Sequence, residues 1–159
     1  MFGSGNATKP QIAFVGEAPG ANEDQTGEPF VGNAGKLLDA MIDAMKMQRS
    51  QLYICNVVNC RPPENRKPLP DEVSACSPYL LGQLRAVQPR ILVALGASAG
   101  QALLKSRKPL KDLRGKWHDW EGTPLRVTFH PAFLLREPSL KKEAWRDLQD
   151  VLAKLRTLH

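Results

Sequence analysis

The sequence predicts an open α/β fold in which a largely parallel sheet carries helices on both faces. Short apolar runs and longer amphipathic segments alternate along the 159 residues, which is the pattern of repeated strand–helix units. In the long segments apolar residues recur at helical spacing. The short runs are continuously apolar, as expected for strands that are buried on both faces.

The first half of the chain is predicted to contain two strands and one helix. Residues 11–15 form a short apolar run, and a glycine-rich loop then leads to a helix over residues 35–45. This loop is longer than ordinary connections, which is typical of a binding loop. The apolar residues of the helix share one face: Leu37, Leu38, Met41, Ile42 and Met45. A second apolar run, residues 52–58, ends in a proline-rich loop over residues 61–70.

Turn and capping residues divide the second half. Its elements, in chain order, are a helix over 71–87 disturbed at Pro78, a strand over 90–95, a helix over 97–104, a hairpin-like return from 117–120 onto a strand over 125–129, and an amphipathic helix over 140–155. Gly96 opens the second of these helices, and Glu121-Gly122 forms the turn of the hairpin. The prediction is therefore four strands and four helices.

The composition favours a globular protein with a cationic surface. Hydrophobic residues make up 42% of the chain, and 22 basic against 16 acidic residues give a net charge of +6. A positive balance suits a polyanionic partner but identifies no site. No run reaches the roughly 18 apolar residues of a membrane span. The cysteine count of three is odd, which argues against a disulfide framework and favours reduced thiols in the cytosol or metal ligands.

Polar side chains follow three of the predicted strands. Glu17 follows the first, Asn56 ends the second and His130 follows the fourth. Because ligands of open α/β sheets bind beyond the carboxyl ends of the strands, these side chains and the aromatic Phe30 are expected at one site. The glycine-rich loop lacks both phosphate-binding glycine patterns, so a nucleotide is disfavoured. Each residue alone also fits a structural role: a solvated carboxylate, a strand cap, or a core aromatic ring.

Three ordered motifs resemble the thermostable, iron–sulfur-type branch of the uracil-DNA glycosylases, family 4. They are GEAPGANEDQTGEPFVGNAGKLLD from Gly16, NVVNCRPPENRKP from Asn56, and HPAFLLR from His130. The resemblance implies a three-layer α/β/α fold around a four-stranded, mainly parallel sheet. It also implies hydrolysis of the bond between uracil and deoxyribose in single- or double-stranded DNA, which leaves an abasic site. Such chemistry requires the nucleotide to be flipped out of the helix.

The resemblance assigns a substrate pocket. Phe30 would stack on the flipped base, and the amide of Asn56 would pair with O4 and N3–H of uracil. Glu23 would fill the space of the thymine methyl group. The backbone N–H groups around Ala18 and Gly20 would face O2.

The resemblance also assigns catalytic residues. His130 would hydrogen-bond the charge that develops at O2 of the leaving uracil. Glu17 stands where sister branches carry an aspartate that orients water and stabilises the sugar cation. Asn65 would help to position that water or the DNA.

Contacts with DNA are expected from two loops. One of Phe133, Leu134 and Leu135 would wedge into the space left by the flipped base, or else Leu134 and Leu135 begin a buried helix. Arg136 would hold a nearby phosphate, as would Arg61 and Arg66.

The chain departs from the family pattern at the iron–sulfur cluster. Members hold a [4Fe–4S] cluster with four cysteines, and Cys60 and Cys76 match the second pair of these. The first pair, an N-terminal CxxC, has no counterpart, and Cys55 lies inside a strand, where a small hydrophobe is expected. Four thiolates are needed, so this chain alone builds no cluster and would require an upstream CxxC. A trimmed start, a misassigned gene start and loss of the cluster remain open.

Other functions stay open beside the glycosylase. They are a non-catalytic or covalently trapped uracil-DNA-binding module, a module of a polymerase-associated protein, and a glycosylase for other deaminated bases. The trapping branch carries an extra basic loop, and no such insertion lies between Gly32 and Asn56. We expect one domain over residues 1–159, with residues 1–10 flexible. We also expect a monomer in the prokaryotic cytoplasm, at the nucleoid.

Overall fold

A six-stranded sheet forms the centre of the protein. The computed structural model describes residues 3–17, 32–57 and 70–158, with side chains from residue 78 onward in the last range. The strand order is β1-β3-β2-β4-β6-β5. The strands are β1 (Ser4–Gly5), β2 (Ile12–Gly16), β3 (Tyr53–Asn56), β4 (Ile91–Leu95), β5 (His118–Trp120) and β6 (Thr123–Thr128). The inner four strands run parallel, and both edge strands are antiparallel to their neighbours.

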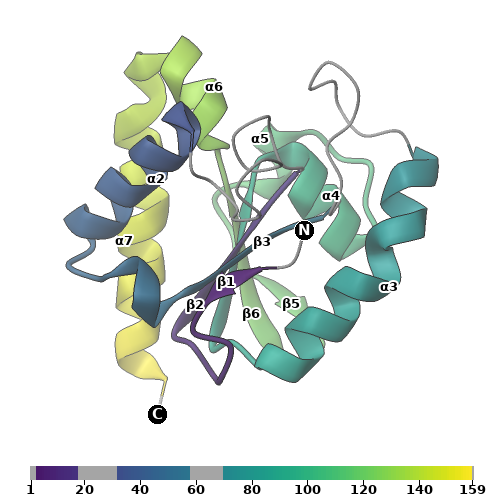
Figure 1. Cartoon of the computed structure of the whole chain (residues 1–159). Coiled ribbons are helices and arrows are strands. Elements are labelled where there is room, and N and C mark those ends of the chain that lie inside the picture. The colour runs from purple at the N-terminus through teal and green to yellow at the C-terminus, as the bar shows by residue number, and fades with distance from the viewer. Residues whose placement is uncertain (1–2, 18–31, 58–69, 159) are drawn as a thin grey trace.

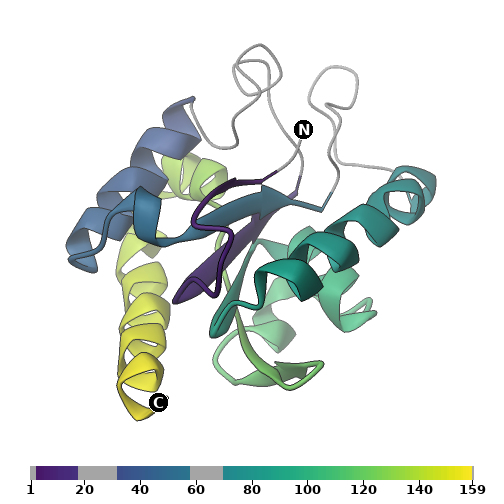
Figure 2. The same ribbon diagram turned by 60° about the horizontal axis from the view of Figure 1, so that its bottom comes forward.

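Helices cover both faces of this sheet (Figures 1 and 2). One face carries α2 (Asn33–Ala44) and α7 (Lys141–Thr157), and the other carries α3 (Pro70–Val87), α4 (Ala97–Leu104) and α5 (Leu110–Leu113). The remaining short helices are η1 (Arg49–Gln51), α6 (Pro131–Arg136) and η3 (Pro138–Leu140). Within the described ranges, no helix is both long and apolar enough to cross a membrane.

Alternating side chains of the central strands build two cores. In β2, Ile12 and Phe14 pack with α2 and α7, whereas Ala13 and Val15 pack with α3, α4 and α5. All four are fully buried. Because β4 and residues Ile54 and Cys55 of β3 are also apolar on both faces, the continuous apolar runs of the sequence mark strands covered on two sides.

The predicted three-layer α/β architecture is confirmed, and the predicted number of strands is too low. The four expected strands are β2, β3, β4 and β6. The expected hairpin arm is β5, which pairs with β6 as a fifth strand. The sixth, β1, has two residues, Ser4 and Gly5, which are too few and too polar to produce a strand pattern.

Two helical predictions also differ from the structure. The helix α3 continues through Pro78, whose side chain is exposed. Proline removes one backbone donor, and an exposed helix face leaves room for the local adjustment that this requires. The short helix α5 is absent from the prediction because four residues are too few to show helical periodicity, and α6 is expected only as the alternative to a DNA contact at Leu134 and Leu135.

Candidate active site

Three predicted site residues lie at the carboxyl edge of the sheet. Glu17 directly follows β2, Asn56 is the last residue of β3, and His130 lies two residues beyond β6. Gly16 and Asn56 are register partners, so Glu17 and Asn56 leave neighbouring strands at the same level. Asn56 is buried, with 4% of its surface exposed, and Glu17 is partly exposed. Parallel strands thus bring an amide, a carboxylate and an imidazole to one edge.

The strand order leaves a gap in this row of side chains. β4 lies between β2 and β6, and the residue that follows it, Gly96, has no side chain. Neighbouring strands are about 4.8 Å apart, so Glu17 and His130 leave strands whose axes lie about 10 Å apart. The carboxylate and the imidazole therefore come from strands that are not neighbours in the sheet.

His130 begins α6 and caps it. Its Nδ1 accepts a hydrogen bond from the backbone N–H of Ala132 at 3.0 Å, and Pro131 occupies the first helical position. An acceptor nitrogen carries no proton, so the neutral ring holds its proton on Nε2. The cap therefore fixes the orientation of the ring and makes Nε2–H the hydrogen-bond donor of the side chain.

Gly96 is required beside His130. A Cβ atom at Gly96 would lie 3.2 Å from Cβ of His130, and φ at Gly96 is +96°, a conformation that side chains disfavour. The Gly96 N–H also donates to the carbonyl of Thr128 at 2.8 Å. The turn after β4 is thus held against the segment that carries the imidazole.

A buried polar network supports the strand end before His130. The carboxylate of Asp147, on α7, accepts from the Thr128 hydroxyl at 2.6 Å and from Nε of Arg114 at 2.9 Å. Arg114 also pairs with Glu143 at 3.3 Å, and its guanidinium lies 4.3 Å from the centre of the Phe129 ring. Asp147 therefore holds Thr128 by a hydrogen bond, and Arg114 holds Phe129 by packing against its ring.

This network was not predicted from the sequence, although the sequence carries one signal of it. Asp147 lies three residues after Ala144 and four before Val151, both buried on the inner face of α7. An acidic residue on the apolar face of a helix needs a polar partner, since an unpaired buried charge is costly. Thr128 and Arg114 carry no comparable signal in the sequence.

The two leucines predicted to contact DNA differ in burial. Leu134 is 1% exposed and packs with Phe129 and Ala144, so its side chain lies in the core of this structure, as the structural alternative to a DNA contact expects. Leu135 is 45% exposed. Arg136 is exposed and lies over the Phe133 ring at 5.9 Å. Leu135 and Arg136 thus stay available for DNA.

Other predicted residues lie outside the described ranges. They are Ala18, Gly20, Glu23, Phe30, Cys60, Arg61, Asn65 and Arg66. Cys76 lies on α3, in the part for which only the backbone is described.

The cysteines of this chain do not fit a [4Fe–4S] cluster by themselves. Cys55 is buried inside β3, and burial raises the pKa of its thiol to about 12, which disfavours the thiolate that a metal requires. Cys60 and Cys76 then remain from the three cysteines of the sequence, two fewer than a cluster needs. Among the described residues, no group of three or more His, Cys, Asp or Glu side chains is arranged to hold a metal ion.

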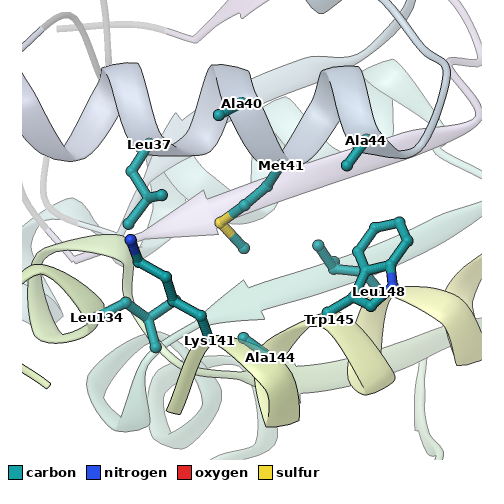
Figure 3. Close-up of a pocket in the computed structure, with 9 residues that line it drawn as sticks. All are labelled: Leu37, Ala40, Met41, Ala44, Leu134, Lys141, Ala144, Trp145 and Leu148. Atoms are coloured by element: carbon teal, nitrogen blue, oxygen red, sulfur yellow. The ribbon is translucent and has the colours of Figure 1, made fainter. Parts of the chain in front are cut away.

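An apolar recess between α2 and α7 is separate from the three site residues. It has a volume of about 230 Å³ and lies between the facing sides of the two helices, with Leu134 at one end (Figure 3). Its lining residues are Leu37, Ala40, Met41, Ala44, Leu134, Lys141, Ala144, Trp145 and Leu148. A nucleobase needs directed hydrogen-bond partners, and among the lining side chains only Lys141 and Trp145 carry a polar group.

Comparisons with known proteins give the family. The family described as "Uracil DNA glycosylase superfamily" matches residues 2–149. The type-4 uracil-DNA glycosylase of Thermotoga maritima is 46% identical over 141 residues, which are 87% of this chain and 73% of that protein. The enzymes of the same name from Pyrobaculum aerophilum and Archaeoglobus fulgidus are each 42% identical, over 86% and 94% of this chain and 74% and 78% of theirs. The chain therefore belongs to the uracil DNA glycosylase superfamily, in its type-4 branch.

Proposed function

We propose that this protein is a uracil-DNA glycosylase that hydrolyses the N-glycosidic bond of uracil in DNA and leaves an abasic site, the first step of base excision repair. One observation carries the proposal: the sheet brings Glu17, Asn56 and His130 to one edge, in a chain that belongs to this superfamily. The net charge of +6 favours a polyanionic substrate.

Asn56 reads the base. Its amide offers one donor and one acceptor, which match O4 and N3–H of uracil. Cytosine presents the opposite pair at these positions and would leave buried groups unpaired, at a cost of about 1–3 kcal/mol for each group. Because Asn56 is 4% exposed at the end of a hydrogen-bonded strand, its amide is held in place before the base arrives.

His130 stabilises the leaving group. When the bond between N1 and C1′ breaks, its electron pair leaves with uracil, and charge develops at O2. A neutral imidazole that donates from Nε2 stabilises this charge, an effect typically worth about 3–4 kcal/mol for one well-placed donor. The cap on Nδ1 supports this assignment, since it fixes the proton on Nε2.

Glu17 orients the water. The water oxygen bonds to C1′ as uracil departs, and the carboxylate accepts the proton that this water loses. Phe30 stacks on the base, Glu23 excludes the thymine methyl group, and Asn65 positions the water or DNA. The N–H groups around Ala18 and Gly20 face O2. These five assignments rest on the family motifs.

An oligonucleotide assay tests the proposal. A labelled strand with one uracil is incubated with the protein and cleaved with alkali, and a cleaved product marks an abasic site. We expect product from the native chain, on single- or double-stranded substrate, and a loss of a hundredfold or more in His130→Ala. Asn56→Asp should lose uracil excision, whereas the matched control Asn6→Asp, at the opposite edge beside Leu52, should retain it.

The same assay separates the alternative functions. Binding without release of uracil would support a non-catalytic module. A protein–DNA adduct that survives denaturation would support the covalently trapped type, and cleavage at hypoxanthine or xanthine alone would support a glycosylase for other deaminated bases. No abasic site on either substrate overturns the proposal.

We further propose that residues 1–159 act as one domain and as a monomer, in the cytoplasm at the nucleoid. A [4Fe–4S] cluster would use Cys60 and Cys76 together with an upstream CxxC. Light scattering tests the monomer, and an iron assay on a protein that carries such an upstream pair tests the cluster.

A further inference from the structure

One short segment carries a net charge almost as large as that of the whole chain. Residues 105–116, KSRKPLKDLRGK, contain six basic residues and one acidic residue, a net charge of +5 beside +6 for the whole protein. The segment contains α5 and its flanking loops, and none of the three family motifs includes it.

Five of the six basic residues of this segment face solvent and are not neutralised by described carboxylates, whereas Arg114 pairs with Asp147 and Glu143. Its exposed basic residues are Lys105, Arg107, Lys108, Lys111 and Lys116. Elsewhere, exposed and buried arginines do pair with acids, as Arg85 does with Glu121 and Arg126 with Asp150. None of the five exposed residues forms an ion pair with a carboxylate in the described part of the chain. Uncompensated charge of one sign attracts a polyanion.

Hydrogen bonds hold the segment in a fixed shape. The backbone carbonyl of Lys108 accepts a hydrogen bond from Nε2 of Gln101 at 2.9 Å, and the backbone N–H of Lys108 donates to the Ser106 hydroxyl at 3.1 Å. Leu113 is 2% exposed and anchors α5 in the core. A recess of about 330 Å³ beside this anchor is lined by Leu104, Ser106, Lys108, Leu113, Lys116 and His118. The cationic groups are therefore presented on an ordered scaffold.

The segment flanks the candidate active site. Arg114 ends α5, and its guanidinium covers Phe129, the residue before His130, at 4.3 Å. In Figure 1, α5 lies near α6 at the end of the sheet where the parallel strands finish. A duplex whose flipped base enters between Glu17 and His130 would extend its backbone past this region.

We propose that residues 105–116 form a phosphate-binding surface for the DNA backbone next to the uracil site. The inference rests on the proposed function for the identity of the nucleic acid. A membrane surface is disfavoured, because Tyr79 and Leu135 are the exposed large hydrophobic residues of the described ranges, and neither lies in the segment. Phosphate contacts position a duplex without reading its sequence.

Charge-matched variants test the proposal. Arg107→Gln, Lys108→Gln and Lys111→Gln are combined in one protein. The control combines Lys46→Gln, Arg90→Gln and Arg156→Gln, three exposed residues at the opposite ends of α2, β4 and α7. Both variants lose three positive charges, so a general effect of net charge would appear equally in both. Affinity for a 20-bp duplex is measured by fluorescence anisotropy at several salt concentrations.

The expected result is specific to the segment. Each lost phosphate contact lowers the slope of log affinity against log salt by about 0.9, so the segment variant should lose about two to three in slope. Its affinity should fall on the order of a hundredfold at 0.1 M salt, equally for duplexes with and without uracil. The control should keep the native slope. Equal slopes in the two variants overturn the proposal, as does a larger effect on RNA than on DNA.

The failures of the two proposals are distinguishable. If the native chain excises uracil and the segment variant keeps the native slope, this inference fails alone. If no uracil is released but the segment variant still loses slope, the glycosylase assignment fails and the DNA surface stands. In an active protein the variant should raise KM and leave kcat unchanged, since phosphate contacts act on binding.

Discussion

Removal of the Asp147 carboxylate should destabilise the protein and slow uracil excision together. In Asp147→Ala, the Thr128 hydroxyl loses its acceptor at 2.6 Å and Arg114 loses the closer of its two carboxylates, at 2.9 Å. Thr128 and Phe129 then hold the polypeptide before His130 less firmly, because Arg114 is the group that covers Phe129.

The magnitude follows from burial. Thr128 is fully buried, so its unpaired hydroxyl costs about 1–3 kcal/mol. The Arg114 side chain is 20% exposed and keeps Glu143, so its share is about 1 kcal/mol. The sum, about 3 kcal/mol, corresponds to a fall in Tm of roughly 6–12 °C for a protein of this size. A displaced imidazole should lower kcat roughly ten- to a hundredfold.

The matched control lies one helical turn further along α7. Asp150 pairs with Arg126 at 2.5 Å, and this pair also joins α7 to β6, nearer the start of the strand. Asp150→Ala leaves the Arg126 side chain, 7% exposed, without its carboxylate and should destabilise to a similar degree. Both variants are assayed well below their Tm. Equal kcat values for the two variants would refute the reasoning, and Asp147→Asn should recover part of the loss because it keeps an acceptor for Thr128.

Three further variants test separate parts of the structure. Gly96→Ala should lower kcat because its new Cβ meets that of His130 at 3.2 Å, whereas Gly122→Ala, with φ of +88° and open space around it, should lose only about 1 kcal/mol of stability. Leu135→Ala should slow excision from duplex DNA more than from a single strand, because its exposed side chain would fill the gap in a base stack. Burial raises the pKa of Cys55 from 9.0 to about 12, so above pH 9 the unfolded chain releases a proton that the folded chain keeps. Stability should therefore fall from pH 9 toward pH 12, by about 1 kcal/mol at pH 10, and Cys55→Ala should flatten this fall in urea denaturation.

Each of these expectations has a contrary outcome. An equal loss of kcat in the two glycine variants would show that backbone strain lowers kcat and that the contact with His130 does not. Equal slowing on both DNA forms would remove the wedge role from Leu135. An unchanged alkaline stability profile in Cys55→Ala would assign the fall in stability to other groups.

Most of the sheet could be predicted because burial on two faces leaves a simple pattern. The strands β2 and β4 are buried at every position, and such runs stand out from amphipathic helices. The edge strand β1 is two residues long and is fixed by pairing with β3, an interaction between distant residues that local patterns do not encode. The edge strand β5 pairs with β6 across the turn at Glu121-Gly122, so it could be expected as the arm of a hairpin. The short helix α6 is likewise set by the cap of His130 and by the burial of Leu134.

The three residues at the strand ends could be predicted from the sequence, but the residues that hold them in position could not. Glu17, Asn56 and His130 stand directly at strand ends, so topology alone places them at one edge. The partners of Asp147 lie 19 and 33 residues away in sequence, and no spacing rule joins them. The protonation of His130 follows only from the position of the Ala132 N–H, which is a consequence of the turn into α6.

The position of β4 between β2 and β6 has a consequence for the activity of the protein on heating. The strands that lead to Glu17 and His130 are separated by twice the distance between neighbouring strands. Backbone hydrogen bonds of the sheet set this distance, and side-chain rotamers do not change it. Such a separation stays constant as long as β2, β4 and β6 remain paired, and these strands belong to the most buried part of the fold. Excision should therefore accelerate with temperature up to the cooperative melting of the sheet and end with it, without an earlier phase of gradual inactivation.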